Sequence, residues 1–220
     1  MADESSRRGD SYGTEAILEF VHKVHSGHDE FLQRAFDAPA LHDMPPIQVS
    51  PSEGKLLGLL IRLSGAKKVV EVGTLAGYSA LWIARHLPPE GHIWTIELEP
   101  KHVDVAQSTL KAAGVADRVT ILEGPALGIL EILVKHGPFD AVFVDADKGN
   151  YDHYGRWAAK NLRVGGLLVA DNAFYFKGLM DDTPEAAAMR RFHQETARAF
   201  DSVCIPTPDG MVVGLLKLRS

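Results

Sequence analysis

Between residues 66 and 171 of the chain, short apolar runs alternate with longer stretches whose apolar positions recur every three or four residues. The short runs predict buried strands, and the longer stretches predict amphipathic helices. We expect strands over residues 68–72, 92–97, 119–122, 141–145 and 167–171. We expect helices over residues 78–86, 100–113, 126–135 and 151–162. This alternation predicts a mostly parallel sheet with helices on both faces.

The C-terminal part of the chain follows a different pattern. We expect a helix over residues 184–200 and then two apolar runs, at residues 202–206 and 211–218. Only a short turn, Pro208-Asp209-Gly210, separates the two runs, so strands there must be antiparallel. The sequence therefore predicts a doubly wound α/β fold, with a mostly parallel, seven-stranded sheet that ends in a C-terminal antiparallel hairpin.

The N-terminal part predicts helices in front of this sheet. Residues 1–12 are polar, and we expect a disordered tail there. Apolar residues at helical spacing over residues 14–36 predict a helical extension, and three prolines predict a loop over residues 37–49. The segment Ser50-Pro51-Ser52-Glu53 is typical of a capping box with proline at the first helical position. It predicts a helix that ends near Gly65.

These boundaries suggest one domain over residues 13–220, with N-terminal helices up to residue 65 and an α/β core from residue 66. A length of 220 residues, 45% of them hydrophobic, is enough for one sizeable core. No apolar run approaches the roughly 20 residues that span a bilayer. The charged N-terminus does not have the pattern of a signal peptide. We therefore expect a soluble, cytoplasmic protein.

Charge and cysteine content restrict the possible partners. The net charge of −6 argues against nonspecific binding to nucleic acid or to an anionic membrane. The single cysteine, Cys204, excludes an internal disulfide and a cysteine metal cluster, and its apolar neighbours predict a buried thiol. The spacing of His22, His25 and His28 could suggest zinc, but no acid or cysteine completes a ligand set. We interpret these histidines as a solvated helix face.

Acids end the first two strands of the predicted sheet. Glu71 ends the first strand, before a turn that contains Gly73, and Glu97 ends the second. In a doubly wound sheet, ligands bind beyond these carboxyl ends. Two acids there suit a ligand with a cationic amine and a ribose diol, and they suit a phosphate poorly. Other interpretations stay open. The glycine turn could serve tight packing, and Ser79 could cap its helix. Glu97 could stabilise the N-terminus of the helix that begins at Pro100 through the helix dipole.

A second group of oxygen ligands follows the fourth and fifth strands. Asp145, Asp171 and Asn172 fall at neighbouring strand ends, which lie about 5 Å apart in a parallel sheet. Two carboxylates and an amide oxygen predict a hard cation such as Mg²⁺, Mn²⁺ or Ca²⁺. The alternative is that the acids cap the helices that follow. Lys148 should reach the same cavity, where it could act as a general base or remain a solvated loop residue.

These residues match a known family. The chain resembles the cation-dependent O-methyltransferases that use S-adenosylmethionine, the group of the catechol and caffeoyl-CoA O-methyltransferases, and most of all their small bacterial members. The resemblance covers nearly all of the chain, and it implies the Rossmann-like fold of the class I methyltransferases. It rests on three motifs, Glu71-Val72-Gly73-x-x-x-Gly77-Tyr78-Ser79, Asp145-Ala146-Asp147-Lys148 and Asp171-Asn172.

The resemblance implies a role for each matching residue. The expected cofactor-binding residues are Val49, Glu71, Gly73, Tyr78, Ser79, Glu97, Gly124, Ala126 and Asp145. Among them, Glu71, Gly73 and Ser79 would hold the methionine portion and Glu97 the ribose. Gly124 and Ala126 would lie at the adenine. Many relatives carry an acid at the position of Pro125, so a side-chain contact to adenine is lost here, although backbone groups can serve.

The resemblance also implies a mechanism and partners. Asp145, Asp171 and Asn172 would be the metal ligands and Lys148 the catalytic base. The expected cofactors are S-adenosylmethionine and a divalent cation, most of all Mg²⁺, and the expected acceptor is a vicinal diphenol. The cation would lower the pKa of one phenol, Lys148 would take its proton, and the phenolate would attack the methyl group in line. The family also suggests a homodimer.

Other functions fit less well. A nicotinamide-dependent oxidoreductase would also place Glu97 at a ribose, but the pattern G-x-G-x-x-G is missing. A nucleic-acid or protein methyltransferase conflicts with the acidic charge and lacks the nitrogen-methylating pattern N/D-P-P-Y. A silent binding module would not need Lys148. We expect residues 41–49 and 173–180 to select the acceptor, and Phe174-Tyr175-Phe176 either to clamp it or to pack on the core.

Overall fold

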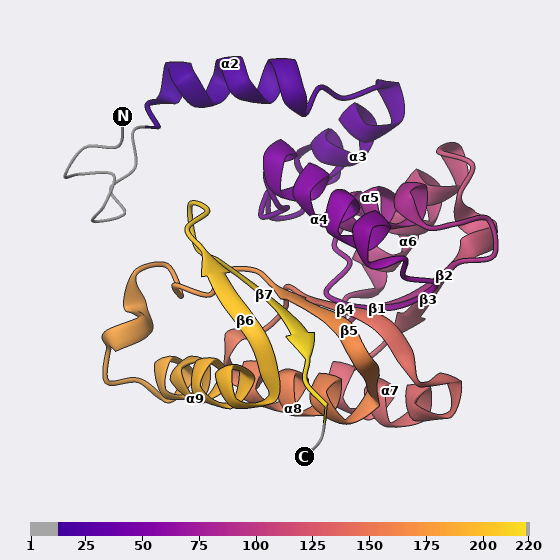
Figure 1. Cartoon of the computed structure of the whole chain (residues 1–220). Helices are drawn as coiled ribbons and strands as arrows, with labels where there is room; N and C mark the ends of the chain where they lie inside the picture. Colours follow the sequence, from indigo (N-terminus) through magenta and orange to yellow (C-terminus); the bar gives the residue numbers. More distant parts are fainter. Residues whose placement is uncertain (1–12, 219–220) are drawn as a thin grey trace.

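The computed structural model describes residues 13–218, so the tail predicted at residues 1–12 lies outside the described residues. The described chain forms one seven-stranded sheet with the order β3-β2-β1-β4-β5-β7-β6 (Figure 1). Its strands are β1 Lys68–Val72, β2 His92–Glu97, β3 Val119–Glu123, β4 Phe139–Val144, β5 Leu162–Ala170, β6 Phe200–Ile205 and β7 Met211–Leu216. β1 to β5 are parallel, and β7 is antiparallel to both β5 and β6. The predicted fold class is confirmed.

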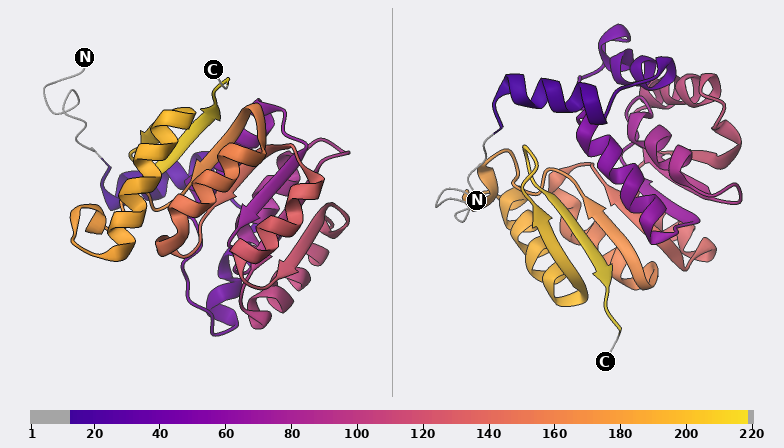
Figure 2. Two further views of the ribbon diagram at one scale, coloured as in Figure 1. Left: turned by 90° about the horizontal axis from the view of Figure 1, so that it is seen from below. Right: turned by 45° about the horizontal axis from the view of Figure 1, so that its top comes forward.

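Helices cover both faces of the sheet (Figures 1 and 2). One face carries α4 Pro51–Ser64, α5 Tyr78–His86 and α6 Pro100–Ala112, and the other carries α7 Ala126–Leu133, α8 Tyr151–Asn161 and α9 Pro184–Ala199. Side chains of each strand alternate between the two faces. In β4, Ala141 and Phe143 join the core under α4 and α5, whereas Val142 and Val144 join the core over α7 to α9. Both faces are buried, which explains the near-continuous apolar runs.

The register of the sheet brings the strand ends together. Val72 at the end of β1 pairs with Ile96 in β2 and with Val144 in β4, and Val144 pairs with Ala170 in β5. The residues that follow these strands therefore meet at one edge. β4 and β5 begin earlier than predicted, and Asp145 and Asp171 lie just after the strands rather than at their last positions.

The helical extension predicted over residues 14–36 is confirmed, although it continues beyond residue 36. Over residues 13–41, the described chain forms α2 Glu15–His25 and α3 Glu30–Leu41, because Asp29 caps a new helix by accepting from the backbone N–H groups of Phe31 and Leu32. The loop predicted over residues 37–49 begins later, at residue 42, since α3 continues through Pro39. Pro39 lies in the last turns of the helix and is buried, so packing offsets the hydrogen bond that its missing N–H would make. The capping box of α4 is confirmed, with Gly65 as its left-handed end.

Helix α2 extends away from the sheet (Figure 1), and within this described helix no residue is buried. Phe20 is 68% exposed and Val24 is 56% exposed.

At the other end of the chain, Cys204 on β6 is half-buried rather than buried as predicted, and burial raises the pKa of its thiol. Within residues 13–218, no helix combines the length and the apolar character needed to cross a bilayer.

Candidate active site

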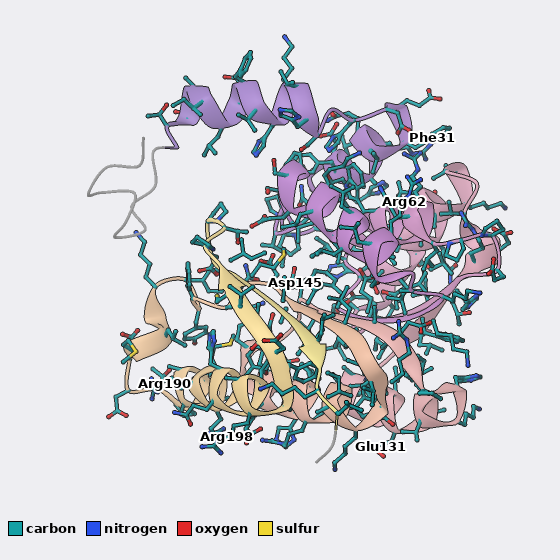
Figure 3. All side chains as sticks on the ribbon, in the orientation of Figure 1. Phe31, Arg62, Glu131, Asp145, Arg190 and Arg198 are labelled. Carbon is teal, nitrogen blue, oxygen red and sulfur yellow. The ribbon has the colours of Figure 1, made fainter. Side chains whose placement is uncertain are left out.

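A cavity of about 700 Å³ opens at the carboxyl edge of β1, β2 and β4. It brings together residues from both predicted groups: Val49, Gly73, Tyr78, Ser79, Glu97, Gly124, Ala126, Asp145, Lys148 and Asn172. Glu71 and Asp171 lie behind this lining, with 0% and 3% of their surface exposed. In Figure 3, Asp145 lies between the sheet and the N-terminal helices. One cavity therefore adjoins the predicted cofactor residues and the predicted metal ligands.

The end of β1 places a buried acid beside a turn that only glycine can form. Burial raises the pKa of Glu71 to about 8, although hydrogen bonds from Thr95 and Ser79 oppose this shift. Its Oε1 atom has no hydrogen-bond partner among the described residues. Gly73 has a φ of 99°, and a Cβ there would lie 2.0 Å from the backbone oxygen of Asp145. The β1 turn and the loop after β4 are therefore in direct contact.

Glu97 is held firmly by backbone groups. Its Oε2 atom accepts from the N–H groups of Thr74 at 3.2 Å and Leu75 at 2.8 Å. Its Oε1 atom accepts from Leu98 and Glu99, and it lies 3.3 Å from Nδ1 of His102. The carboxylate connects the turn after β1 to the residues just before α6, so this acid has a structural role. It also lines the cavity, which keeps it available to a ligand.

The start of α5 connects the cavity to the N-terminal helices. The Tyr78 hydroxyl lies 2.7 Å from Nε2 of His28, and its ring packs edge-on against Phe36. Burial raises the pKa of Tyr78 to about 12. The solvated helix face predicted for His28 is wrong, because this half-buried side chain lies between α2 and α3 and also contacts Gln33. No local pattern in the chain indicates a contact across 50 residues.

The loops after β4 and β5 meet through a lysine. Nζ of Lys148 donates to Oδ1 of Asp145 at 3.0 Å and to Oδ1 of Asn172 at 2.7 Å. It also donates to the hydroxyl of Tyr151 at 2.8 Å. Burial raises the pKa of Tyr151 well above its ordinary value, so its oxygen stays a neutral hydroxyl. Tyr151 was not among the predicted site residues, although its position one helical turn after Lys148 could have indicated it.

Asp171 completes this group from within the core. Its Oδ1 atom is buried and has no hydrogen-bond partner within the described chain. Burial, together with the charges of Asp145 and Glu53, raises the pKa of Asp171 to about 8. Among residues 13–218, no group of three or more His, Cys, Asp or Glu side chains is placed to hold a metal ion. The predicted ligand set contains only two such side chains, Asp145 and Asp171, because its third member, Asn172, is an amide.

Two further segments, the motif around Asp147 and the aromatic group after β5, have separate places around the cavity. Asp147 accepts from Tyr154 and from Asn150, each at 2.5 Å, and so it stays apart from the Lys148 contacts. In the aromatic group after β5, Tyr175 packs against the core, whereas Phe176 is 65% exposed and lines the cavity. Packing on the core is therefore confirmed for Tyr175, and a clamp on the acceptor stays a prediction for Phe176.

Comparison with known proteins identifies the family. A family model described as O-methyltransferase matches residues 23–217. The chain belongs to the O-methyltransferase family. A catechol O-methyltransferase from Niastella koreensis is 38% identical to this family member over 92% of this chain and 97% of its own length. A catechol O-methyltransferase from Mycobacterium tuberculosis is 39% identical over 90% and 94% of the two chains.

Solved structures agree with this O-methyltransferase assignment. An O-methyltransferase from Bacillus cereus in complex with SAH has a TM-score of 0.88 and 33% identity, over 92% of this chain and 97% of its own. The O-methyltransferase TomG from Streptomyces achromogenes, in complex with SAM, has a TM-score of 0.87 and 35% identity, over 99% and 100%. The family assignment argues against the nicotinamide-dependent alternative.

Proposed function

We propose that this protein transfers a methyl group from S-adenosylmethionine to a hydroxyl of a vicinal diphenol, with the help of a divalent cation. The observation that carries the proposal is the shared cavity, which adjoins Glu71 and Glu97 on one side and Lys148 and Asn172 on the other. Relatives named catechol O-methyltransferase support the acceptor class. Neighbours in complex with SAH and SAM support the cofactor.

The cofactor side offers oxygen acceptors and a close approach to the backbone. Glu71 is buried with one unpartnered oxygen, so a cationic amine nearby would favour its ionised form and offset its burial. Gly73 has no side chain to keep a ligand from the turn. Glu97 is already oriented by four N–H groups, so a ribose diol would meet a fixed carboxylate. The cofactor supplies an activated methyl group, which these residues hold in place.

The residues on the acceptor side fit a hard cation. Asp145 and Asn172 turn oxygens toward one point, where Lys148 contacts both. Asp171 beside them has a buried oxygen without a partner among the described residues. Oxygen donors of this kind suit Mg²⁺ or Mn²⁺. A cation held there would bind both diphenol oxygens and lower the pKa of one of them.

Lys148 is the proposed proton acceptor. Its amino group lies on the cavity wall beside Asp145 and Asn172, within reach of a hydroxyl bound there. Tyr151 holds the same amino group from the core side and so fixes where the nitrogen lies. Because charge is neutralised when a phenolate meets a sulfonium methyl, most of the rate gain comes from positioning the two reactants.

We further propose a homodimer in which a second copy covers α2. The helix presents Ile17, Phe20 and Val24 to solvent, and apolar side chains gathered on one element favour association. Light scattering should give twice the chain mass, and Phe20→Lys should shift the protein toward the monomer. A wild-type monomer at micromolar concentration would refute this part of the proposal.

A methyl-transfer screen tests the function. Catechols, caffeoyl derivatives and flavonoids would be incubated with S-adenosylmethionine, with and without Mg²⁺, and the products identified by mass spectrometry. We expect methylated catechol-type products only with the cation. Products formed equally well without a cation, or methylation confined to acceptors with a single hydroxyl, would refute the proposal.

A further inference from the structure

The hairpin turn between β6 and β7 contacts the loop that follows β5. The backbone N–H of Ala173 donates to the oxygen of Gly210 at 2.8 Å, and that of Phe174 donates to the oxygen of Asp209 at 2.8 Å. A Cβ at Gly210 would lie 2.7 Å from the Phe174 ring, so a side chain here would push the loop away. The turn, predicted only as a chain reversal, therefore packs closely on the loop after β5.

The Asp209 side chain makes a second contact with the same loop. Its Oδ1 and Oδ2 atoms accept from the backbone N–H of Phe176 at 2.9 and 3.2 Å. Burial raises the pKa of Asp209, against the lowering effects of the Phe176 N–H and the Asn172 side chain. The half-buried carboxylate of Asp209 thus interacts with both Asn172 and Phe176, four residues apart on this loop.

The loop needs such support because its backbone is strained. Asn172, Tyr175, Phe176 and Lys177 have φ values of 54°, 52°, 51° and 70°. Residues with a Cβ rarely adopt this left-handed region, and three of these four are consecutive. Nε2 of His193 lies 2.8 Å from the Ala173 oxygen and adds a contact from α9. Contacts from outside the loop must maintain this conformation.

The same loop forms the acceptor side of the cavity. Asn172 contacts Lys148 at 2.7 Å, and the Phe176 ring centroid lies 6.0 Å from the Lys148 nitrogen. Both Asn172 and Phe176 line the cavity, whereas Asp209 does not appear in its lining. A change at Asp209 would therefore reach the acceptor through the loop and would leave the Glu71 and Glu97 side untouched.

We propose that Asp209 is a positioning residue for the methyl acceptor, which holds the segment from Asn172 to Lys177 in its strained shape and so places Phe176 and Asn172 beside the acceptor. The inference rests on the proposed function for the identity of the acceptor. The hold of Asp209 on the loop can be tested without any activity.

Kinetics of three variants test the acceptor role. Asp209→Ala removes the carboxylate, Asp209→Asn keeps an oxygen for the Phe176 N–H, and Asp201→Ala removes an exposed acid from the same hairpin. With catechol and Mg²⁺, we expect Asp209→Ala to lower kcat/KM for the acceptor by at least about tenfold. Calorimetry should show SAH binding unchanged within about twofold. Asp209→Asn should recover most of the loss, and Asp201→Ala should match the wild type.

Trypsin digestion without any substrate tests the loop itself. Lys177 is exposed within the strained segment, so loss of the Asp209 contact should speed cleavage after Lys177 several-fold, as followed by mass spectrometry. Asp201→Ala should be cleaved at the wild-type rate. The inference is overturned if Asp209→Ala matches Asp201→Ala in cleavage and in kinetics, or if it loses SAH affinity as strongly as acceptor turnover. An inactive wild type would refute the proposed function, and the cleavage rates would still decide whether Asp209 holds the loop.

Discussion

The amino group of Lys148 donates to Oδ1 of Asn172 at 2.7 Å and so joins the loops that follow β4 and β5. Asp145, on the first of these loops, accepts from the same nitrogen at 3.0 Å. The proposed proton acceptor thus lies against two proposed metal ligands. It donates to the oxygens that would hold a cation, and it adjoins the place where a diphenol would bind.

Replacing Lys148 by alanine should impair the reaction far more than cofactor binding. Loss of a positioned proton acceptor lowers turnover by about 10²- to 10⁴-fold. Lys148 lies on the acceptor side, so SAH affinity measured by calorimetry should change by less than about threefold. Lys135→Ala, at an exposed lysine after α7, should behave as the wild type. Comparable losses of turnover and SAH affinity would argue that Lys148 has a general structural role.

Asp171→Asn should weaken cation binding without unfolding the protein. The variant replaces a buried carboxylate that has no partner at Oδ1 among residues 13–218 by a neutral group of the same shape. We expect the Mg²⁺ concentration for half-maximal activity to rise at least about tenfold. Thermal unfolding of the cation-free protein should be unchanged or shifted upward, because burial already raises the pKa of Asp171 to about 8. The exposed Asp104→Asn is the matched control. An unchanged Mg²⁺ requirement would remove Asp171 from the ligand set.

The cofactor-free protein should lose stability as the pH rises from about 4.5 to about 8. Burial raises the pKa of Glu71 from 4.5 to about 8, so in this window the folded protein holds a proton that the unfolded chain has released. The free energy of unfolding then falls with pH, by at most about 1.4 kcal/mol per pH unit for this group. Above about pH 8 the folded protein carries the full cost of a buried, ionised Glu71, and below pH 4.5 this cost is absent.

Urea unfolding of the wild type and of Glu71→Gln isolates this contribution. Burial also raises the pKa of Asp171, which is present in both proteins. The contribution of Glu71 is therefore the difference between the two proteins in how the free energy of unfolding changes with pH. Glu71→Gln should have the flatter pH dependence and should bind SAH more weakly. If the free energy of unfolding changed equally with pH in the two proteins between pH 5 and 8, the pKa of Glu71 would not be raised in the folded protein.

Gly73→Ala should destabilise the protein strongly. The new Cβ would lie 2.0 Å from the backbone oxygen of Asp145 at a φ of 99°, and no side-chain rotation can relieve a clash with backbone. We expect a loss of at least about 2 kcal/mol in the free energy of unfolding. At Gly128 in α7, a Cβ would meet no heavy atom of the described chain within 4 Å, so Gly128→Ala should be neutral or stabilising by about 1 kcal/mol. Similar unfolding midpoints for the two variants would contradict the close contact between Gly73 and the Asp145 backbone.

The sequence predicted those parts of the fold that depend on local pattern. The bounds of β1 and α5 match because an apolar run, a glycine turn and a helical pattern follow one another there. The end of α3 was missed because burial of Pro39 outweighs its poor helix propensity. Residues brought to the site from a distance could not be predicted. The contacts of His28 with Tyr78 and of Asp209 with Phe176 cross 50 and 33 residues, and no local spacing encodes them.

The most direct test of the account is a crystal structure with SAH and Mn²⁺, in which anomalous scattering locates the cation. We predict one strong peak roughly 2.0–2.5 Å from oxygens of Asp145, Asp171 and Asn172, with SAH extending from Glu71 to Glu97. In that structure, the Lys148 nitrogen should no longer contact both Asp145 and Asn172. A peak at other residues, or SAH bound away from the two glutamates, would contradict the proposed site.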